Sequence, residues 1–167
     1  MKITTRRLTL GPLSEGDLER AIDLFTDELV KETYMLPDFD SREAAIPLFR
    51  RVMTLSHSQE RYVWGIFLDG DFIGLLNETD RDGEVIELGY ALLPAYHNRG
   101  YCTEALEGAI GHLFEAGFAA VTAAAFTENP ASFRVMEKAG MKPIDKTEEI
   151  EYRGRVHTCL YYEICRG

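Results

Sequence analysis

The sequence is short of cysteine and of long hydrophobic runs. Its 167 residues include three cysteines, Cys102, Cys159 and Cys165. Their odd number and their spacing predict neither a disulfide framework nor a metal site. The most apolar stretch, residues 118–126, is far shorter than the roughly 20 residues of a membrane-spanning helix. No apolar segment follows the polar and basic residues 1–7, so we expect no secretory signal, no membrane association and a reducing cytoplasm.

Basic residues are also in the minority. The chain has 18 Lys and Arg against 28 Asp and Glu, which gives a formal net charge of −10. Proteins that bind nucleic acid usually present a basic face, so we expect no nucleic-acid partner. The negative charge suits a cationic acceptor such as an amine or a basic peptide. This charge supports such an acceptor only weakly, because many proteins are acidic simply for solubility.

Internal repeats, low-complexity tracts and linkers rich in proline or serine are absent as well. The length suits one domain, since domains cluster near about 100–150 residues. A hydrophobic fraction of 46% supplies a core without disulfides or metals. The sequence therefore predicts a single domain over residues 1–167.

Hydrophobic spacing and turn residues predict seven strands and four helices. Apolar residues in Leu18–Leu29 recur at helical spacing. The turns at Asp69–Asp71 and at residues 80–84 divide the middle of the chain into an antiparallel meander. Pro47 does not suit a helix interior, so the second helix either begins late, near Ile46, or is kinked. The strands are expected at about 3–10, 62–68, 72–79, 85–93, 119–126, 141–152 and 155–165, and the helices at about 14–29, 41–55, 99–115 and 129–139.

The strand at 85–93, the helix at 99–115 and the strand at 119–126 form one crossover unit. Such a connection makes its two strands parallel neighbours within an otherwise antiparallel sheet. The predicted fold class is therefore mixed α/β (α+β). A Rossmann-type nucleotide fold is disfavoured, because the loop before this helix lacks Gly-x-Gly-x-x-Gly and the meander does not suit a doubly wound sheet.

The loop of this unit places a glycine at the start of a helix. Backbone N–H groups at a helix start have no partners within the helix and favour an anion. Gly100 has no Cβ to block a phosphate, and Arg99 can add a charged contact. The pattern therefore suits a pyrophosphate. Taken alone, it fits an ordinary strand-to-helix turn better, because such glycines are common.

Four stretches resemble the GNAT N-acetyltransferase superfamily. His97–Cys102 resembles its signature Gln/Arg-x-x-Gly-x-Gly/Ala, with Gly100 at the central glycine, whereas His97 and Cys102 depart from the two ends. Three further stretches are similar to the ribosomal-protein-alanine N-acetyltransferase (Rim-type) branch, and in order they extend the resemblance over essentially the whole chain. They are Thr5–Leu13 (Thr-x-Arg-Leu-x-Leu), Glu87–Leu92 (Glu-Ile-Gly-Tyr) and Asn129–Met141 (Asn-x-x-Ser…Glu-Lys-x-Gly-Phe).

The resemblance implies a mostly antiparallel sheet of about seven strands, with helices on both faces and a split between the strands at 85–93 and 119–126. It implies acetyl-CoA as co-substrate and no metal. Pantetheine would lie in the split, and pyrophosphate would lie on the amides of the loop. The implied cofactor-binding residues are Leu92, Leu93, His97, Asn98, Arg99, Gly100, Tyr101, Cys102, Thr103 and Asn129.

Two residues are candidates for catalysis. Glu87 can reach the amine directly or through water; the alternative is a surface carboxylate paired on the sheet. Many GNAT enzymes carry a general-acid tyrosine where this chain has Met136. In the Rim-type branch a serine one turn earlier suits that task, and Ser132 holds this position here. Its alternative is an ordinary first-turn serine. His97 is expected to be a loop histidine in solvent rather than a catalytic group.

Tyr34 and Tyr90 are candidate substrate-binding residues, because Tyr34 lies between the first two helices, a region that usually shapes the acceptor site in this family. The expected reaction moves an acetyl group to a primary amine, on a protein N-terminus or a small molecule, by direct attack in a ternary complex. The alternative is a non-catalytic acyl-CoA-binding sensor or regulatory module, which Met136, His97 and Cys102 favour. We expect a monomer or a homodimer.

Replacing Cys102 tests the placement of this loop. The family pattern has glycine or alanine there, so removal of the sulfur widens the loop. We expect Cys102→Ala to bind acetyl-CoA as tightly as the wild type or more tightly, as measured by isothermal titration calorimetry. Much weaker binding would contradict the placement.

Overall fold

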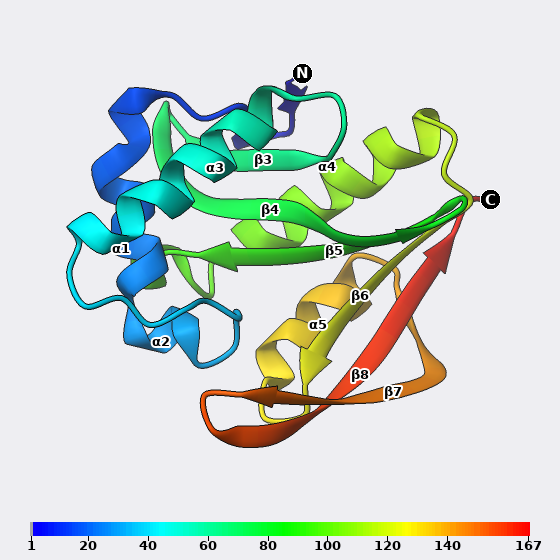
Figure 1. Ribbon diagram of the computed structural model, residues 1–167. Coiled ribbons are helices and arrows are strands. Elements are labelled where there is room, and N and C mark those ends of the chain that lie inside the picture. The colour runs from blue at the N-terminus through cyan, green and yellow to red at the C-terminus, as the bar shows by residue number, and fades with distance from the viewer. Residues whose placement is uncertain (1) are drawn as a thin grey trace.

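The computed structural model describes residues 2–167, which form one eight-stranded sheet flanked by helices (Figure 1). The strand order is β1-β2-β3-β4-β5-β6-β8-β7, and only β5 and β6 are parallel. The elements are β1 (Ile3–Thr4), β2 (Leu8–Gly11), the 3₁₀ turn η1 (Glu15–Asp17), α1 (Leu18–Thr26), α2 (Glu28–Lys31), η2 (Glu43–Ala45), α3 (Ile46–His57), β3 (Val63–Leu68), β4 (Asp71–Asp82), β5 (Val85–Leu92), η3 (Pro94–Tyr96), α4 (Tyr101–Glu115), β6 (Ala120–Phe126), α5 (Pro130–Lys138), β7 (Lys142–Tyr152) and β8 (Arg155–Cys165).

The meander β3–β4–β5 follows the turn residues of the sequence. Asp69 and Gly70 have φ values of 50° and 87°, the left-handed pair that a tight hairpin requires. The second turn is shorter than the predicted 80–84. The register of β4 against β5 shifts between Glu78 and Asp80, and pairing then continues to Asp82. The chain therefore reverses only at Gly83–Glu84.

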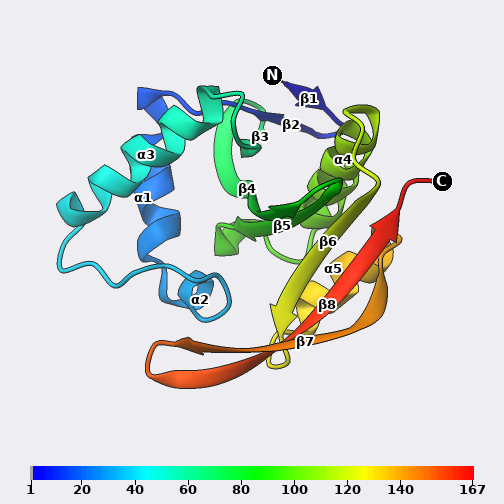
Figure 2. The same ribbon diagram turned by 45° about the vertical axis from the view of Figure 1, so that its right-hand side comes forward.

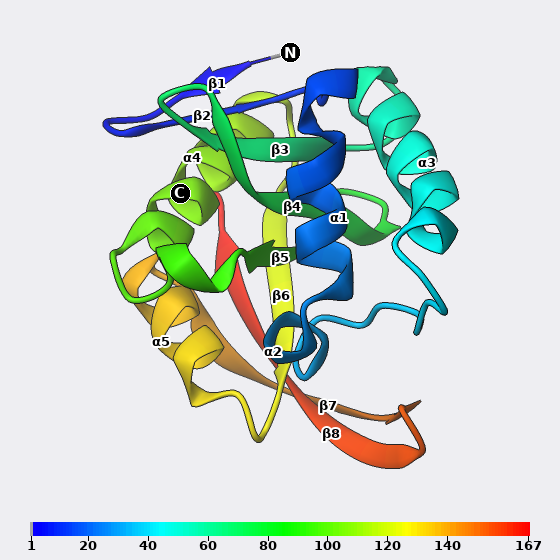
Figure 3. The same ribbon diagram turned by 90° about the vertical axis from the view of Figure 1, so that its left-hand side faces the viewer.

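The split of the sheet lies between β5 and β6, as the sequence predicts. The two strands pair in parallel only from Val85↔Ala120 to Leu88↔Ala123. Beyond these residues β6 continues along β8 as far as Phe126↔Cys159, whereas β5 continues along β4. Figure 3 shows β6 and β8 running steeply across the direction of β3, β4 and β5. The second halves of β5 and β6 are therefore not paired with each other.

Helices cover both faces of the sheet (Figure 2). Helix α4 buries Ala105, Leu106, Ala109, Ile110 and Leu113 against one face, and α5 adds Met136 there. Helices α1 and α3 cover the other face with residues such as Phe25 and Phe49. These apolar residues recur at helical spacing, which is why the sequence predicts the helices.

The N-terminal strand departs from the prediction. The expected strand at 3–10 is divided into β1 and β2, which gives eight strands instead of about seven. The chain reverses between the two strands, because β1 pairs antiparallel with β2 and the Thr5 N–H donates to the Leu8 carbonyl oxygen across the turn. Thr5 and Arg7 of this turn bind Glu104 of α4.

Two helix boundaries also differ from the expected ones. The first helix ends at Thr26, because Asp27 adopts an extended conformation and accepts a hydrogen bond from the N–H of Val30, which starts α2. Leu29, predicted on the apolar face, is therefore 52% exposed. Of the two possibilities for Pro47 the late start is confirmed, since α3 begins at Ile46. Within residues 2–167 no helix has the length and apolar character needed to cross a membrane.

Candidate active site

A cavity of about 580 Å³ opens where β5 and β6 part. Its walls come from α2, β4, β5, the loop before α4, the first turns of α4 and α5, and β8. Most residues predicted for the site line it: Tyr34, Glu87, Tyr90, Leu92, His97, Asn98, Gly100, Tyr101, Cys102, Thr103, Asn129 and Ser132. The fold therefore gathers side chains from distant segments into one space.

Leu93 and Arg99 do not line this cavity. The N–H of Leu93 donates to the Ile73 carbonyl oxygen at 2.8 Å, and its side chain packs on the α1 face of the sheet. The Arg99 side chain is exposed, and its carbonyl oxygen accepts from Nη1 of Arg7 at 3.0 Å. Neither residue faces the cavity in this structure, and their expected ligand contacts stay predictions.

Pairing with β4 decides which main-chain groups of β5 face the split. Leu93 directs its N–H toward β4, and successive residues of an antiparallel strand direct these groups to opposite edges. Tyr90 and Leu92 therefore turn their main-chain groups toward β6. Because pairing with β6 ends at Leu88, these groups face the cavity instead of a strand.

The His97 side chain folds back onto the end of β5. Its Nε2 lies 2.8 Å from the carbonyl oxygen of Leu92, so the ring donates a hydrogen bond to it. The expectation of a loop histidine in solvent is therefore wrong. The contact engages the Leu92 carbonyl group and fixes the loop against the strand, which leaves the Leu92 N–H as the group directed into the split.

The start of α4 has the features of an anion site. Asn98 and Gly100 both have positive φ, 61° and 79°. The first N–H with a partner inside the helix is that of Glu104, which donates to the Gly100 carbonyl oxygen. The N–H groups of residues 101–103 therefore precede the first helical hydrogen bond and lie at the positive end of a 15-residue helix. A Cβ at position 100 would be strained and would lie 3.2 Å from Nη2 of Arg7, so the residues present fit a pyrophosphate.

Arg7 and Glu104 hold this loop in place. Nε of Arg7 lies 2.7 Å from Oε1 of Glu104, and the Arg7 guanidinium stacks 4.4 Å above the Tyr101 ring. Thr5 Oγ1 donates to the other carboxylate oxygen. Burial opposes ionisation of Glu104, but the hydrogen bonds from Thr5 and Arg7 outweigh it and lower its pKa. Sequence reasoning missed both residues, although Arg7 stands in the resembling stretch Thr5–Leu13.

The start of α5 has an N-cap residue and, next to it, a serine whose hydroxyl group contacts a tyrosine hydroxyl group. Oδ1 of Asn129 accepts from the Ser132 N–H at 3.4 Å, so Asn129 is the predicted N-cap. Oγ of Ser132 lies 2.7 Å from the hydroxyl of Tyr90 on β5. Tyr90 was expected on the acceptor side with Tyr34. Its hydroxyl group instead meets α5, on the face of the sheet that α4 and α5 cover.

Glu87 lies on the opposite face of β5. Its neighbours Ile86 and Leu88 are buried in the core beneath α4, so the alternation of the strand turns Glu87 away from that core. The carboxylate accepts from Oγ1 of Thr79 at 2.6 Å and lines the cavity. Cys159 and Tyr161 of β8 line it too, and no pattern in the sequence indicates this place for Cys159.

Both cavity thiols are held in the neutral form. Burial raises the pKa of Cys102 to about 12. Burial, together with the negative charges of Glu148, Glu87 and Glu128, raises the pKa of Cys159 to about 11. The thiolate is the nucleophilic form of cysteine, so neither side chain is activated to attack a thioester at neutral pH.

Tyr34 forms a wall at the α2 end of the cavity. Its hydroxyl donates to Oδ1 of Asn77 on β4 at 2.5 Å, and burial raises its pKa. A second, smaller cavity of about 260 Å³ lies between α1, α3 and β3–β4 and shares Tyr34, Met35 and Asn77 with the first. These residues therefore separate two hollows.

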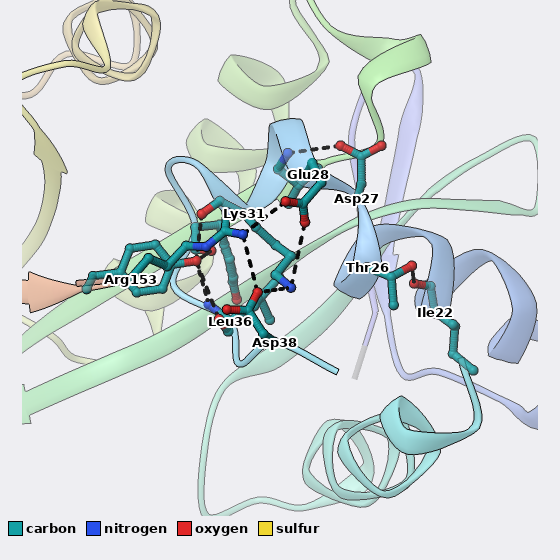
Figure 4. A network of polar contacts seen from close by, with 11 residues as sticks. Ile22, Thr26, Asp27, Glu28, Lys31, Leu36, Asp38 and Arg153 are labelled. Carbon is teal, nitrogen blue, oxygen red and sulfur yellow. Dashed lines mark hydrogen bonds and ion pairs between the residues drawn. The ribbon is translucent and has the colours of Figure 1, made fainter. Parts of the chain in front are cut away.

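An ionic clamp lies where α2 and the loop after it meet the β7–β8 hairpin (Figure 4). We use this name for Glu28 and Lys31 of α2, Asp38 of the loop after it, and Tyr152 and Arg153 at the tip of the β7–β8 hairpin. Nζ of Lys31 lies 2.6 Å from Asp38, and Nη2 of Arg153 lies 2.9 Å from Glu28 and 3.3 Å from Asp38. The Tyr152 hydroxyl donates to the Lys31 carbonyl oxygen at 2.6 Å. The clamp thus joins α2 and the loop after it to the β7–β8 hairpin.

Metal ligands are not clustered in this part of the protein. In the described range 2–167 no group of three or more His, Cys, Asp or Glu side chains is placed to hold a metal ion.

The family of the chain follows from these features and from its sequence. The model of the acetyltransferase (GNAT) domain family matches residues 7–142. The chain belongs to the GNAT acetyltransferases and is an acetyl-CoA-dependent acetyltransferase. Its open, mostly antiparallel sheet with helices on both faces is the GNAT fold.

Individual relatives share this class. The uncharacterized N-acetyltransferase YoaA of Bacillus subtilis (strain 168) is 26% identical over 145 residues, which are 84% of this chain and 82% of YoaA. The structure of RimL, a ribosomal L7/L12 alpha-N-protein acetyltransferase, in complex with coenzyme A is 17% identical, with a TM-score of 0.86, and the match covers 99% of this chain and 98% of RimL. Spermidine N-acetyltransferase from Vibrio cholerae, with CoA and spermine, is 18% identical, with a TM-score of 0.79 and 95% of each chain covered. At such identities the two structures show a shared fold.

Removal of the Arg7 side chain tests whether it supports the phosphate loop. We expect Arg7→Ala to raise the Kd for acetyl-CoA about five- to tenfold, because about 1 kcal/mol of charge-assisted contact is lost. Calorimetric titration gives the Kd, and Arg6→Ala, at an exposed neighbouring arginine, is the matched control. An unchanged Kd for Arg7→Ala would contradict the role.

Arg153→Ala tests the clamp. Exposed ion pairs contribute about 0–1 kcal/mol each, so the variant should fold, and Lys31 keeps Asp38 as a partner. We expect a severalfold higher KM for the acceptor amine and an almost unchanged Kd for acetyl-CoA, because α2 lines the cavity whereas the implied cofactor-binding residues lie on β5, at the start of α4 and at the start of α5. Arg155→Ala in the same hairpin should leave both constants unchanged. If Arg153→Ala raised the Kd for acetyl-CoA as much as the KM for the amine, a role of the clamp in amine binding alone would be ruled out.

Proposed function

We propose that this chain transfers an acetyl group from acetyl-CoA to a primary amine by direct attack in a ternary complex. One observation carries the proposal. A single cavity at the parting of β5 and β6 joins the free N–H groups at the start of α4, the hydroxyl of Ser132 and the carboxylate of Glu87. An acyl donor and an amine can therefore meet in one space.

The start of α4 and the facing edge of β5 would hold the acyl donor. The N–H groups of residues 101–103 suit the pyrophosphate, and Arg7 supports this loop through Glu104 and the Arg99 carbonyl oxygen. The Leu92 and Tyr90 main-chain groups that face the split suit the amide groups of pantetheine, and an N–H there can also bind the oxygen of the acyl group as its charge grows. Asn129 fixes the start of α5 on the other side.

Glu87 and Ser132 would handle protons on opposite sides of the acyl carbon. Glu87 accepts a proton from the attacking amine, directly or through water. Ser132 donates its hydroxyl hydrogen to the sulfur that leaves with the electron pair of the broken C–S bond. A covalent cysteine intermediate is disfavoured, because the raised pKa values of Cys102 and Cys159 keep both thiols protonated.

The acceptor is proposed as a protein N-terminus or a small amine. RimL and the spermidine enzyme, which share the fold, act on these two kinds of amine. A screen of thiol release from acetyl-CoA over peptides, polyamines and aminoglycosides tests the proposal. Release with one class of amine supports it, whereas binding of acetyl-CoA without turnover across the panel would favour the sensor alternative. A cytoplasmic location and a monomer or homodimer stay predictions from the sequence.

Ser132→Ala tests the proton donor. We expect kcat to fall about a hundredfold, the lower end of general acid–base contributions, with the Kd for acetyl-CoA almost unchanged. The cap of α5 is provided by Asn129, so the variant keeps the helix start. Ser58→Ala, at a half-buried serine that does not line the cavity, is the control. Unchanged turnover in Ser132→Ala would remove this residue from the mechanism.

A further inference from the structure

Tyr90 contacts the proposed proton donor from across the split. Its hydroxyl oxygen lies 2.7 Å from Oγ of Ser132 and 3.4 Å from the Ser132 carbonyl oxygen. Tyr90 belongs to β5 and Ser132 to α5, so the pair bridges the two walls of the cavity. Both side chains are within the same hollow as the start of α4.

This chain has Met136 at the position on α5 where many GNAT enzymes carry a general-acid tyrosine. Met136 is fully buried in the core beneath the helix and has no proton to donate. A phenol is nevertheless present, because β5 supplies one from the facing wall. The fold thus places a hydroxyl group of tyrosine beside Ser132 without a tyrosine on the helix.

The chemistry of the pair sets the direction of its hydrogen bond. A phenol is a stronger donor than an aliphatic hydroxyl, and burial raises the pKa of Tyr90, so its proton stays on the oxygen at neutral pH. When Tyr90 donates, Oγ of Ser132 is the acceptor. The single hydrogen of Ser132 is then left for another acceptor in the cavity.

We propose that Tyr90 is a positioning residue for acetyl transfer, which holds the Ser132 hydroxyl so that its hydrogen points at the departing sulfur. This inference rests on the proposed function of Ser132. In the step, the N–C bond forms, the C–S bond breaks, and the sulfur keeps the electron pair and takes the hydrogen of Ser132. The hydrogen bond from Tyr90 stabilises the negative charge that grows on Oγ. The amine releases a proton to water by way of Glu87, and Ser132 regains a proton from water. Overall, one proton passes from the nitrogen to the sulfur.

The role differs from the acceptor contact expected for Tyr90 from the sequence. An acceptor-binding residue would change the KM for the amine, whereas a residue that orients Ser132 changes kcat. The two roles are therefore separated by steady-state kinetics. Tyr90→Phe is the suitable variant, because it keeps the ring that packs in the core and removes only the hydroxyl group.

The experiment compares Tyr90→Phe, Ser132→Ala and the double variant with the wild type, with thiol release as the assay. We expect Tyr90→Phe to lower kcat about five- to tenfold, as the loss of one hydrogen bond of about 1 kcal/mol would, without changing either KM. The double variant should be no slower than Ser132→Ala, because Tyr90 acts only through Ser132. Tyr62→Phe, which lies outside the cavity, is the matched control.

Each other outcome overturns the inference in a distinct way. A slow Ser132→Ala with a normal Tyr90→Phe overturns the role of Tyr90 and leaves the proposed function intact. A normal Ser132→Ala removes Ser132 from the mechanism and the role of Tyr90 with it. Multiplied losses in the double variant show separate roles, and a raised KM for the amine with normal kcat places Tyr90 in the acceptor site.

Discussion

The early end of β-pairing between β5 and β6 is the constraint on which the rest of the structure depends. Four residue pairs join the two strands, and then β6 remains with β8 while β5 remains with β4. Main-chain groups that would otherwise complete a sheet are left facing a hollow. Because a buried polar group needs a partner, this edge is suited to a ligand with amide groups of its own. The cavity, the entry of α4 and the placement of α5 all follow from the same divergence.

Polar contacts add to the four β5–β6 pairs that hold the sheet together. Arg7 and Glu104 fix the loop before α4, and the clamp joins α2 to the β7–β8 hairpin. Lys31 is buried, so its charge requires the carboxylate of Asp38, whereas Arg153 is more exposed and contributes less to stability. These contacts tie α4 to the segment between β1 and β2, and α2 to the β7–β8 hairpin.

The two faces of β5 carry different candidate groups for the proposed reaction. Alternation along the strand turns Glu87 to one face and Tyr90 to the other, three residues apart. In the proposed mechanism the base serves the attacking nitrogen and the proton donor serves the departing sulfur, so the two groups reach the acyl carbon from different directions. Strand β5 carries Glu87 on one face and, on the other, Tyr90, whose hydroxyl group contacts Ser132 of α5.

The sequence by itself determined what depends on neighbours along the chain. The left-handed turn at Asp69-Gly70, the late start of α3 at Pro47, the glycine that opens α4 and the Asn129 cap follow from local conformational preferences. Tertiary structure alone decided the contacts between distant residues, such as Arg7 with Glu104 and Tyr90 with Ser132. It also decided that Leu29 is exposed and that the Leu93 N–H is engaged by Ile73. Hydrophobic period and turn chemistry carry no information on which distant partner a polar group meets, since that depends on how the strands pair and where they part.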